Sequence, residues 1–204
     1  MQILLKIGMT SEQYVSERGW LVATLTSCPV HPTGGCGFRA HGSYGRKTPA
    51  GLRVARFYCA EGQVTFSLLP DFMAASYRGT LGEVEDAVRV AEQAASIVAA
   101  AQQLRPELDD QRSAARWLRR RVSALRRGLS SLVTSVPALF GVTSTLSAVA
   151  TKLGAEAGRV LEAAREAAQP LLALMATPLG FRHRSSTSEQ SVLALQHTMG
   201  PAPG

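Results

Sequence analysis

The order of apolar and polar residues divides the chain into two parts. Residues 1–79 contain short alternating runs such as WLVATLTS and LRVARFYC, separated by Gly, Pro and Thr, and this pattern is typical of strands and turns. From Thr80 onward apolar residues recur every three or four positions among Ala, Leu, Glu and Arg, as they do in amphipathic helices. The pattern therefore predicts an α+β protein with a small β domain over 1–79, followed by a mainly α-helical region.

Three helices are predicted over residues 80–128. The first begins at Thr80, where Glu83 completes a capping-box pattern. The second is ASIVAAAQQL, which Pro106 ends, and the third begins at an acidic cap formed by Asp109 and Asp110. Three helices of these lengths favour a helix-turn-helix over 80–128, with the third helix contacting DNA.

The third helix has an apolar seam that continues beyond residue 128. Its members follow one another at spacings of 4, 3, 4, 3 and 4: Leu118, Val122, Leu125, Leu129, Leu132 and Val136. Such a seam exceeds the needs of a three-helix DNA-binding unit. We expect residues 129–181 to form a long helical hairpin that packs on itself or mediates a homodimer. The polar, Pro- and Gly-ended stretch 182–204 is predicted to be a disordered tail.

One uncharged stretch, 128–151, is long enough to span a bilayer. It contains Pro137 and nine Ser or Thr residues, and this composition argues against a membrane-spanning helix. We therefore do not expect the membrane to be a partner. The opening MQILLKIGMTSEQ lacks the features of a secretory signal. We therefore expect a cytoplasmic protein.

The net charge points to a class of partner. A charge of +7 and a pI near 9.9 favour an anionic partner such as nucleic acid. No acid occurs between Glu17 and Glu61, and the candidate DNA contacts there are Arg46, Lys47 and Arg53. Residues 111–128 hold seven arginines and no acid. The candidate DNA contacts in that helix are Arg112, Arg116, Arg119, Arg120, Arg126 and Arg127. The alternative is a solvated face that pairs with the acidic helix before it.

The cysteines suggest a metal site. All three lie in a window of 32 residues, and Cys28-x2-His31 has the spacing of a metal knuckle. Two ligand clusters joined by a predicted hairpin describe a zinc ribbon. Its Zn²⁺ would be bound by Cys28, His31, Cys36 and Cys59. The alternative is a metal-free ribbon in which the cysteines fill a core.

These residues also carry a resemblance. The run HGSYGRKTPAGLRVARFYC, followed by TFSLLPDF, is similar to the zinc-ribbon segment of bacterial insertion-sequence proteins, which are transposases or transposase-associated accessory proteins. In that group the ribbon precedes a helix-turn-helix, and SAARWLRRR resembles a recognition helix whose tryptophan packs inward. The resemblance covers roughly residues 26–125. It implies DNA binding, with a transposase subunit as a partner.

The resemblance is incomplete at one point. In such proteins a further Cys or His commonly follows the Cys59 position by three or four residues, where this chain has Gly62 and Gln63. Either Cys36 and His31 complete the site, or the site is weakened.

We do not expect an enzyme. A transposase nuclease needs three separated carboxylates for two metal ions, whereas the acids here are concentrated in the predicted helices. The chain has neither a phosphate-binding loop nor a nucleophile elbow, and nothing orients Cys36 with His41 as a nucleophile pair. The first hypothesis is a DNA-binding accessory protein of a mobile element. The second is a non-catalytic protein–protein adaptor that assembles a complex through its helices.

Overall fold

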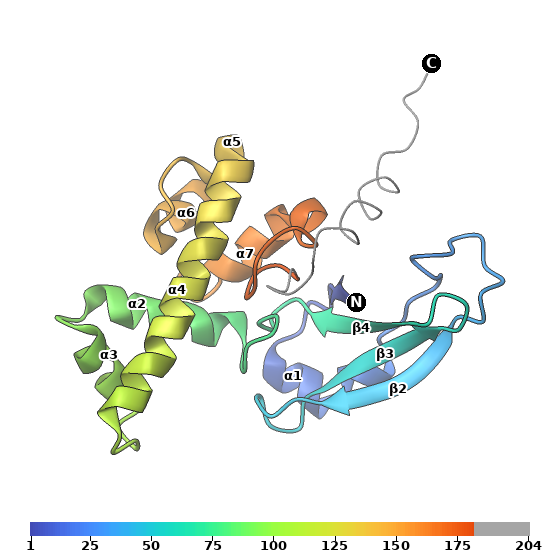
Figure 1. The fold of residues 1–204 in the computed structure, drawn as a ribbon, viewed down its shortest axis with the longest axis horizontal. Coiled ribbons are helices and arrows are strands. Elements are labelled where there is room, and N and C mark those ends of the chain that lie inside the picture. Colours follow the sequence, from blue (N-terminus) through green and yellow to red (C-terminus); the bar gives the residue numbers. More distant parts are fainter. Residues whose placement is uncertain (182–204) are drawn as a thin grey trace. The chain divides into compact units, whose positions relative to one another are not determined.

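The structure is a computed structural model that describes residues 1–181; the predicted tail over 182–204 lies outside the described residues. The fold is α+β, as predicted, with a four-stranded sheet followed by a mainly helical region (Figure 1). The chain divides into two compact units, the first comprising Met1–Val84 and the second beginning at Glu85. The predicted boundary between 79 and 80 lies close to this division, just before helix α2 (Leu81–Gln93).

The sheet contains β1 (Gln2–Leu5), β2 (Arg39–Gly45), β3 (Arg53–Cys59) and β4 (Val64–Pro70), in the order β1-β4-β3-β2. Strands β2, β3 and β4 form an antiparallel meander, and β1 pairs in parallel with β4. The predicted hairpin is therefore β2–β3, with a register shift between Ala40 and Ser43.

The run WLVATLTS is not a strand, contrary to prediction. It forms a short 3-10 helix, η1 (Gly19–Leu21), and a loop. Leu21 and Val22 are consecutive and are 69% and 62% exposed, so the run lacks the alternation that places every second side chain in a core. Its inward-facing residues are Trp20, Ala23 and Leu25, which pack against the sheet.

One face of the sheet carries the cysteine cluster of the first unit, and Val54 and Leu69 on the other face are buried as well. Phe66 of β4 and the three cysteines form one buried cluster, against which Phe38 and Phe57 pack. Ala23, Ala55 and Leu68 form a second buried cluster beside it. The cysteines are thus part of the core, and they are also the candidate metal ligands.

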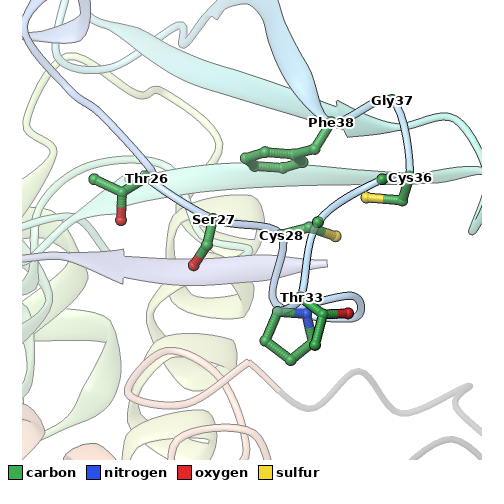
Figure 2. Close-up of a pocket in the computed structure, with 10 residues that line it drawn as sticks. Thr26, Ser27, Cys28, Thr33, Cys36, Gly37 and Phe38 are labelled. Carbon is green, nitrogen blue, oxygen red and sulfur yellow. The ribbon is translucent and has the colours of Figure 1, made fainter.

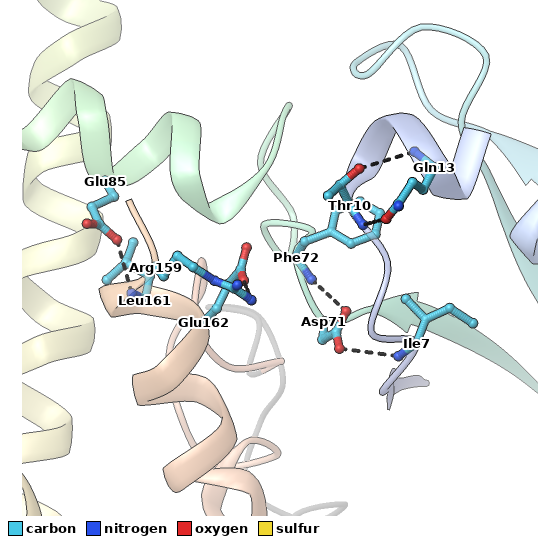
Figure 3. A network of polar contacts seen from close by, with 9 residues as sticks. All are labelled: Ile7, Thr10, Gln13, Asp71, Phe72, Glu85, Arg159, Leu161 and Glu162. Atoms are coloured by element: carbon cyan, nitrogen blue, oxygen red, sulfur yellow. Dashed lines mark hydrogen bonds and ion pairs between the residues drawn. The ribbon is translucent and has the colours of Figure 1, made fainter. Parts of the chain in front are cut away.

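Helix α1 (Ser11–Ser16) begins with a capping box between Thr10 and Gln13 (Figure 3). Its Tyr14 is fully buried and meets the rings of Trp20 and Phe72 edge to face. The carboxylate of Asp71, directly after β4, accepts hydrogen bonds from the N–H groups of Ile7 and Phe72. These contacts hold α1 and its flanking loops to the end of the sheet.

Two predicted helix starts, at Thr80 and Asp110, and the predicted helix end before Pro106 are confirmed. At the start of α2, Thr80 N–H donates to Glu83 Oε2 at 2.9 Å, and Glu83 N–H donates to Thr80 Oγ1 at 3.1 Å. Helix α3 (Ile97–Leu104) ends before Pro106. Helix α4 (Gln111–Ser135) begins at Asp110, whose carboxylate accepts the N–H groups of the first turn.

Helix α4 contains the predicted apolar seam. Leu118, Val122, Leu125, Leu129 and Leu132 are all buried, and Val136 follows the end of the helix. The helix continues through the predicted boundary between 128 and 129. The seam therefore belongs to one long helix of the second unit.

The rest of the second unit differs from the long hairpin expected over 129–181. It consists of three short helices and a 3-10 turn: α5 (Pro137–Phe140), α6 (Leu146–Leu153), α7 (Val160–Ala167) and η2 (Gln169–Leu171). Pro137 ends α4, since the residue before a proline disfavours helical backbone. Gly154 ends α6 in a left-handed conformation with φ of 63°. Within residues 1–181, no helix combines the length and the apolar character needed to cross a membrane.

Two buried charges in the second unit were not predicted from the sequence. Glu85 is 1% exposed, and its carboxylate accepts hydrogen bonds from the N–H groups of Gly158 and Leu161 at the start of α7 (Figure 3). Arg165 is also 1% exposed and donates to the carbonyl oxygens of Pro178 and Leu179. Both charges are hydrogen-bonded to backbone groups, so both stabilise the packing of the short helices.

Candidate metal centre

The turn after Cys28 brings the first two candidate ligands together. Gly34 N–H donates to the His31 carbonyl at 3.0 Å and closes the turn. The backbone N–H groups of Val30 and His31 are close enough to the Cys28 sulfur to help lower its pKa. Thiolates are favoured by such donors, so this turn is suited to hold a metal-bound sulfur.

The end of β3 supplies the third cysteine in a similar way. Gly62 N–H lies 3.3 Å from the Cys59 sulfur and donates to it. The Cys36 carbonyl accepts the N–H groups of Ala60 and Glu61, both at 3.2 Å. The loop that holds Cys36 is therefore fixed directly to the turn that follows Cys59.

The structure brings all four predicted metal ligands together. The ligand atoms of Cys28, His31, Cys36 and Cys59 lie within 4.8 Å of one another. His31 Nδ1 is 3.8 Å from the Cys28 sulfur and 3.3 Å from the Cys59 sulfur. Tetrahedral bonding to one zinc ion would separate nitrogen and sulfur ligands by about 3.6 Å, from ordinary zinc bond lengths. The residues thus fit a metal ion of this size.

The centre is closed to solvent on its sulfur side. Cys28, Cys36 and Cys59 are 2%, 3% and 0% exposed, and none of them forms a disulfide. The sulfur atoms of Cys28 and Cys36 face one another in Figure 2, where a pocket of about 420 Å³ adjoins the loop that carries them. Four protein ligands with buried sulfurs are typical of structural metal sites.

The pKa values of two thiols show that the cluster is electrostatically coupled. Burial raises the pKa of Cys28, but hydrogen bonds from His31 and Val30 outweigh burial and lower it to about 7. Burial raises the pKa of Cys36, and the neighbouring thiols of Cys59 and Cys28 raise it further, to about 11. A thiolate at Cys28 therefore disfavours a second thiolate at Cys36, and a bound cation would offset that repulsion.

His31 has a defined orientation. Its Nδ1 faces the sulfurs, whereas its Nε2 lies 4.0 Å from a carboxylate oxygen of Glu61. Metal-bound histidines usually donate their second ring N–H to such an acceptor. Glu61 is thus a candidate acceptor for that N–H, and the sequence did not single it out because no spacing rule links it to His31.

The structure explains the incomplete second knuckle. A Cβ atom on Gly62 would lie 3.3 Å from the Cys59 sulfur and 3.4 Å from Cε1 of His31. The position where a further ligand was expected is therefore occupied by the ring of His31. The sequence left two alternatives open. In one of them Cys36 and His31 complete the ligand set, and this alternative has the geometry it requires, since all four ligand atoms lie close together. His41 lies apart from this group, in β2, with its ring against Tyr58.

The candidate DNA contacts of α4 are all on its surface. Six of its arginines are exposed: Arg112, Arg116, Arg119, Arg120, Arg126 and Arg127. The seventh, Arg121, lies with its guanidinium 4.3 Å from the ring centre of Trp117, and Arg105 lies 5.3 Å from the same ring. Trp117 is half-buried, so it differs from the inward-packed tryptophan that the resemblance implies.

The candidates in the hairpin have different surroundings. Arg46 is half-buried and donates to the carbonyl oxygens of Ala74 and Tyr77, so it supports the fold. Arg53 is exposed, and its guanidinium donates to the hydroxyl and the carbonyl of Ser43. Lys47 is exposed. Of the three, Lys47 and Arg53 keep a charge accessible to a ligand.

None of the protein-family models, curated proteins and solved structures compared with this chain matches it. The resemblance to insertion-sequence proteins therefore stays a prediction, and the function has to be argued from the geometry of the chain itself.

Proposed function

We propose that the protein binds duplex DNA through helix α4 and that a Zn²⁺ ion held by Cys28, His31, Cys36 and Cys59 stabilises its first unit. Three soft thiolates and one imidazole, with no position left for a further ligand in a four-coordinate site, suit zinc. The observation that supports the metal is the convergence of the four ligand atoms within 4.8 Å. With four protein ligands, the ion would have a structural role.

The observation that supports DNA binding is that the six exposed arginines of α4 form no ion pairs with acids of the described residues, 1–181. Asp86 pairs with Arg89, Glu107 pairs with Arg105, and Glu85 is buried against α7. Asp110 at the N-cap of α4 is the acid closest to this row, and the charge of Arg116 contributes, after hydrogen bonds from Ser113 and Arg112, to lowering the pKa of Asp110. Exposed arginines without ion pairs are suited to phosphates.

The wider role follows from the sequence resemblance alone. We infer a transposase-associated accessory protein of a bacterial mobile element, acting in the cytoplasm with a transposase subunit, as a single chain or a homodimer. The competing proposal is a protein–protein adaptor that assembles a complex without contacting DNA.

The deciding experiment measures duplex binding by the full chain at several salt concentrations. We expect affinity to fall steeply with salt, and the variant Arg116→Gln/Arg119→Gln/Arg120→Gln to lower the slope of log K against log[salt] by up to about three. A control variant removes three charges outside α4: Arg18→Gln, Arg89→Gln and Lys152→Gln. If the α4 variant binds like the parent, the adaptor proposal replaces DNA binding.

A further inference from the structure

The two faces of the sheet differ in chemistry. Directly opposite residues of an antiparallel pair share a face. The pairs Arg39–Tyr58 and Arg56–Ser67 therefore lie on one face, and Phe57–Phe66 lies on the other, against the cysteines. Tyr44, which is opposite Val54, shares the face of Arg56, because residues 54 and 56 are two apart along β3.

Aromatic rings and cations are paired on this polar face. The guanidinium of Arg39 lies 5.6 Å from the ring centre of Tyr58, and that of Arg56 lies 5.8 Å from the ring centre of Tyr44. The ring of His41 is 5.5 Å from Tyr58. Arg39 and His41 are exposed, while Tyr44, Arg56 and Tyr58 are half-buried. The two tyrosine rings, Arg39 and His41 are thus at least partly accessible from solvent, whereas Nε of Arg56 and the side chain of Val54 on the same face are buried.

The charge around these residues has one sign. The chain has no acid between Glu17 and Glu61, and this stretch includes all of β2 and β3. The neighbouring strand β4 contributes the hydroxyl groups of Thr65 and Ser67 to the same face. An anionic ligand would therefore meet cations and hydroxyls, without an opposing carboxylate from these two strands.

We propose that this polar face, comprising Arg39, His41, Tyr44, Arg56 and Tyr58, binds single-stranded DNA. Flat rings on a sheet stack unpaired bases, and the adjacent guanidinium groups contact phosphates or stack on the same bases. Tyr58 and the residue opposite Tyr44 are four positions apart on β3, about 13 Å, so the rings would stack separate bases. A duplex keeps its bases stacked inside and cannot use the rings in this way. The site is distinct from the duplex site proposed on α4.

The test compares two labelled strands bound to the zinc-loaded full chain: a 20-nucleotide oligo(dT) and an abasic strand of equal length and charge. We expect oligo(dT) to bind at least tenfold more tightly, since only its bases can stack on the rings. The variant Tyr44→Leu/Tyr58→Leu should lose that preference while retaining its weaker binding to the abasic strand. Tyr77→Leu, a half-buried tyrosine of the same unit outside this face, is the matched control and should bind like the parent.

Further variants keep the proposal falsifiable if the double leucine variant fails to retain zinc. Arg39→Gln changes only an exposed side chain, and it should weaken binding of both strands several-fold. The α4 triple glutamine variant should lose duplex binding and keep its preference for oligo(dT), which separates failure of this proposal from failure of the duplex site. Equal affinity for the two strands overturns the proposal, and so does unchanged binding by Arg39→Gln or competition by duplex as effective as by oligo(dT).

Discussion

The Nδ1 atom of His31 lies 3.3 Å from the sulfur of Cys59, although 28 residues separate them in the sequence. The contact joins the glycine-rich loop before β2 to the end of β3. The Cys36 carbonyl joins the same two segments through the N–H groups of Ala60 and Glu61. A single metal ion bound by these residues would therefore hold together the loop before β2 and the turn after β3, which cover one side of the sheet.

Removal of the metal should unfold the first unit selectively. The cysteines belong to the buried core of this unit. Without a metal, any thiolate among them would carry a buried charge that no cation compensates, and the unit would be destabilised. Trp20 lies in the first unit and Trp117 in the second, so the single-tryptophan variants Trp117→Phe and Trp20→Phe report on each unit separately. We expect a strong chelator, or Cys59→Ser, to change only the Trp20 signal. Purified protein with less than about one zinc per chain and an unchanged Trp20 signal would contradict the metal centre.

Glu61→Gln should weaken metal binding without unfolding the chain. A carboxylate oxygen of Glu61 lies 4.0 Å from Nε2 of His31, and we expect it to favour the ring orientation in which Nδ1 would bind the ion. Loss of such a carboxylate typically lowers metal affinity about 10-fold or more; because Glu61 is largely exposed, we expect the lower end of that range. Competition with a chromophoric chelator measures the affinity, and Glu17→Gln is the exposed control. Equal affinities of the parent and Glu61→Gln would remove Glu61 from the site.

Tyr14→Phe should leave the protein at least as stable as the parent. The Tyr14 hydroxyl is buried and has no hydrogen-bond partner within residues 1–181, so its removal should eliminate a desolvation penalty of about 1 kcal/mol or more. Urea unfolding at pH 8 measures the difference. A clear loss of stability would show that the hydroxyl has a partner, such as an ordered water.

The same tyrosine predicts a pH dependence. Burial raises the pKa of Tyr14 to about 12, above its ordinary value of 10.0. The protonated form is thus favoured in the folded state, and its contribution is fully present below pH 10 and is lost as pH rises through 12. The free energy of unfolding should therefore fall more steeply between pH 10 and 12 in the parent than in Tyr14→Phe. Parallel curves for the two proteins would contradict the burial of the phenol.

Glu85→Gln should destabilise the second unit by about 1–3 kcal/mol. The carboxylate accepts two backbone N–H groups at the start of α7, and an amide can offer them only one oxygen. Unfolding followed through Trp117 measures the effect. Glu92→Gln, an exposed acid of the same helix, is the control and should change stability little.

Trp117→Leu should cost no more than about 2 kcal/mol, because the ring is half-buried and its main partners are two guanidinium groups. By contrast, Leu125→Ala in the buried seam should cost about 2–5 kcal/mol. Thermal unfolding of both variants provides the comparison. A larger loss for Trp117→Leu than for Leu125→Ala would restore the inward-packed tryptophan that the resemblance implies.

Features encoded within a few residues could be predicted from the sequence. The helix starts at Thr80 and Asp110 depend on side chains two or three positions from the backbone groups they cap. The four candidate ligands were identifiable because cysteines are rare in this chain and lie in one window. The α+β class followed from the change of period near residue 80.

Features that depend on distant partners could not be predicted. Glu85 accepts hydrogen bonds from residues 73 and 76 positions away, so no local pattern distinguishes it from the exposed acids around it. The run WLVATLTS resembles a strand in composition, but both of its most exposed residues are apolar and adjacent. The expected long hairpin failed because Pro137 and the glycines after it divide the apolar pattern into short helices.

The bonds from Arg46 to the carbonyl oxygens of Ala74 and Tyr77 have a mechanical consequence. They connect the tip of the β2–β3 hairpin to the segment that leads into α2, 28 and 31 residues further along the chain. A force that bends the hairpin would therefore reach this segment through the guanidinium group of Arg46 as well as along the chain.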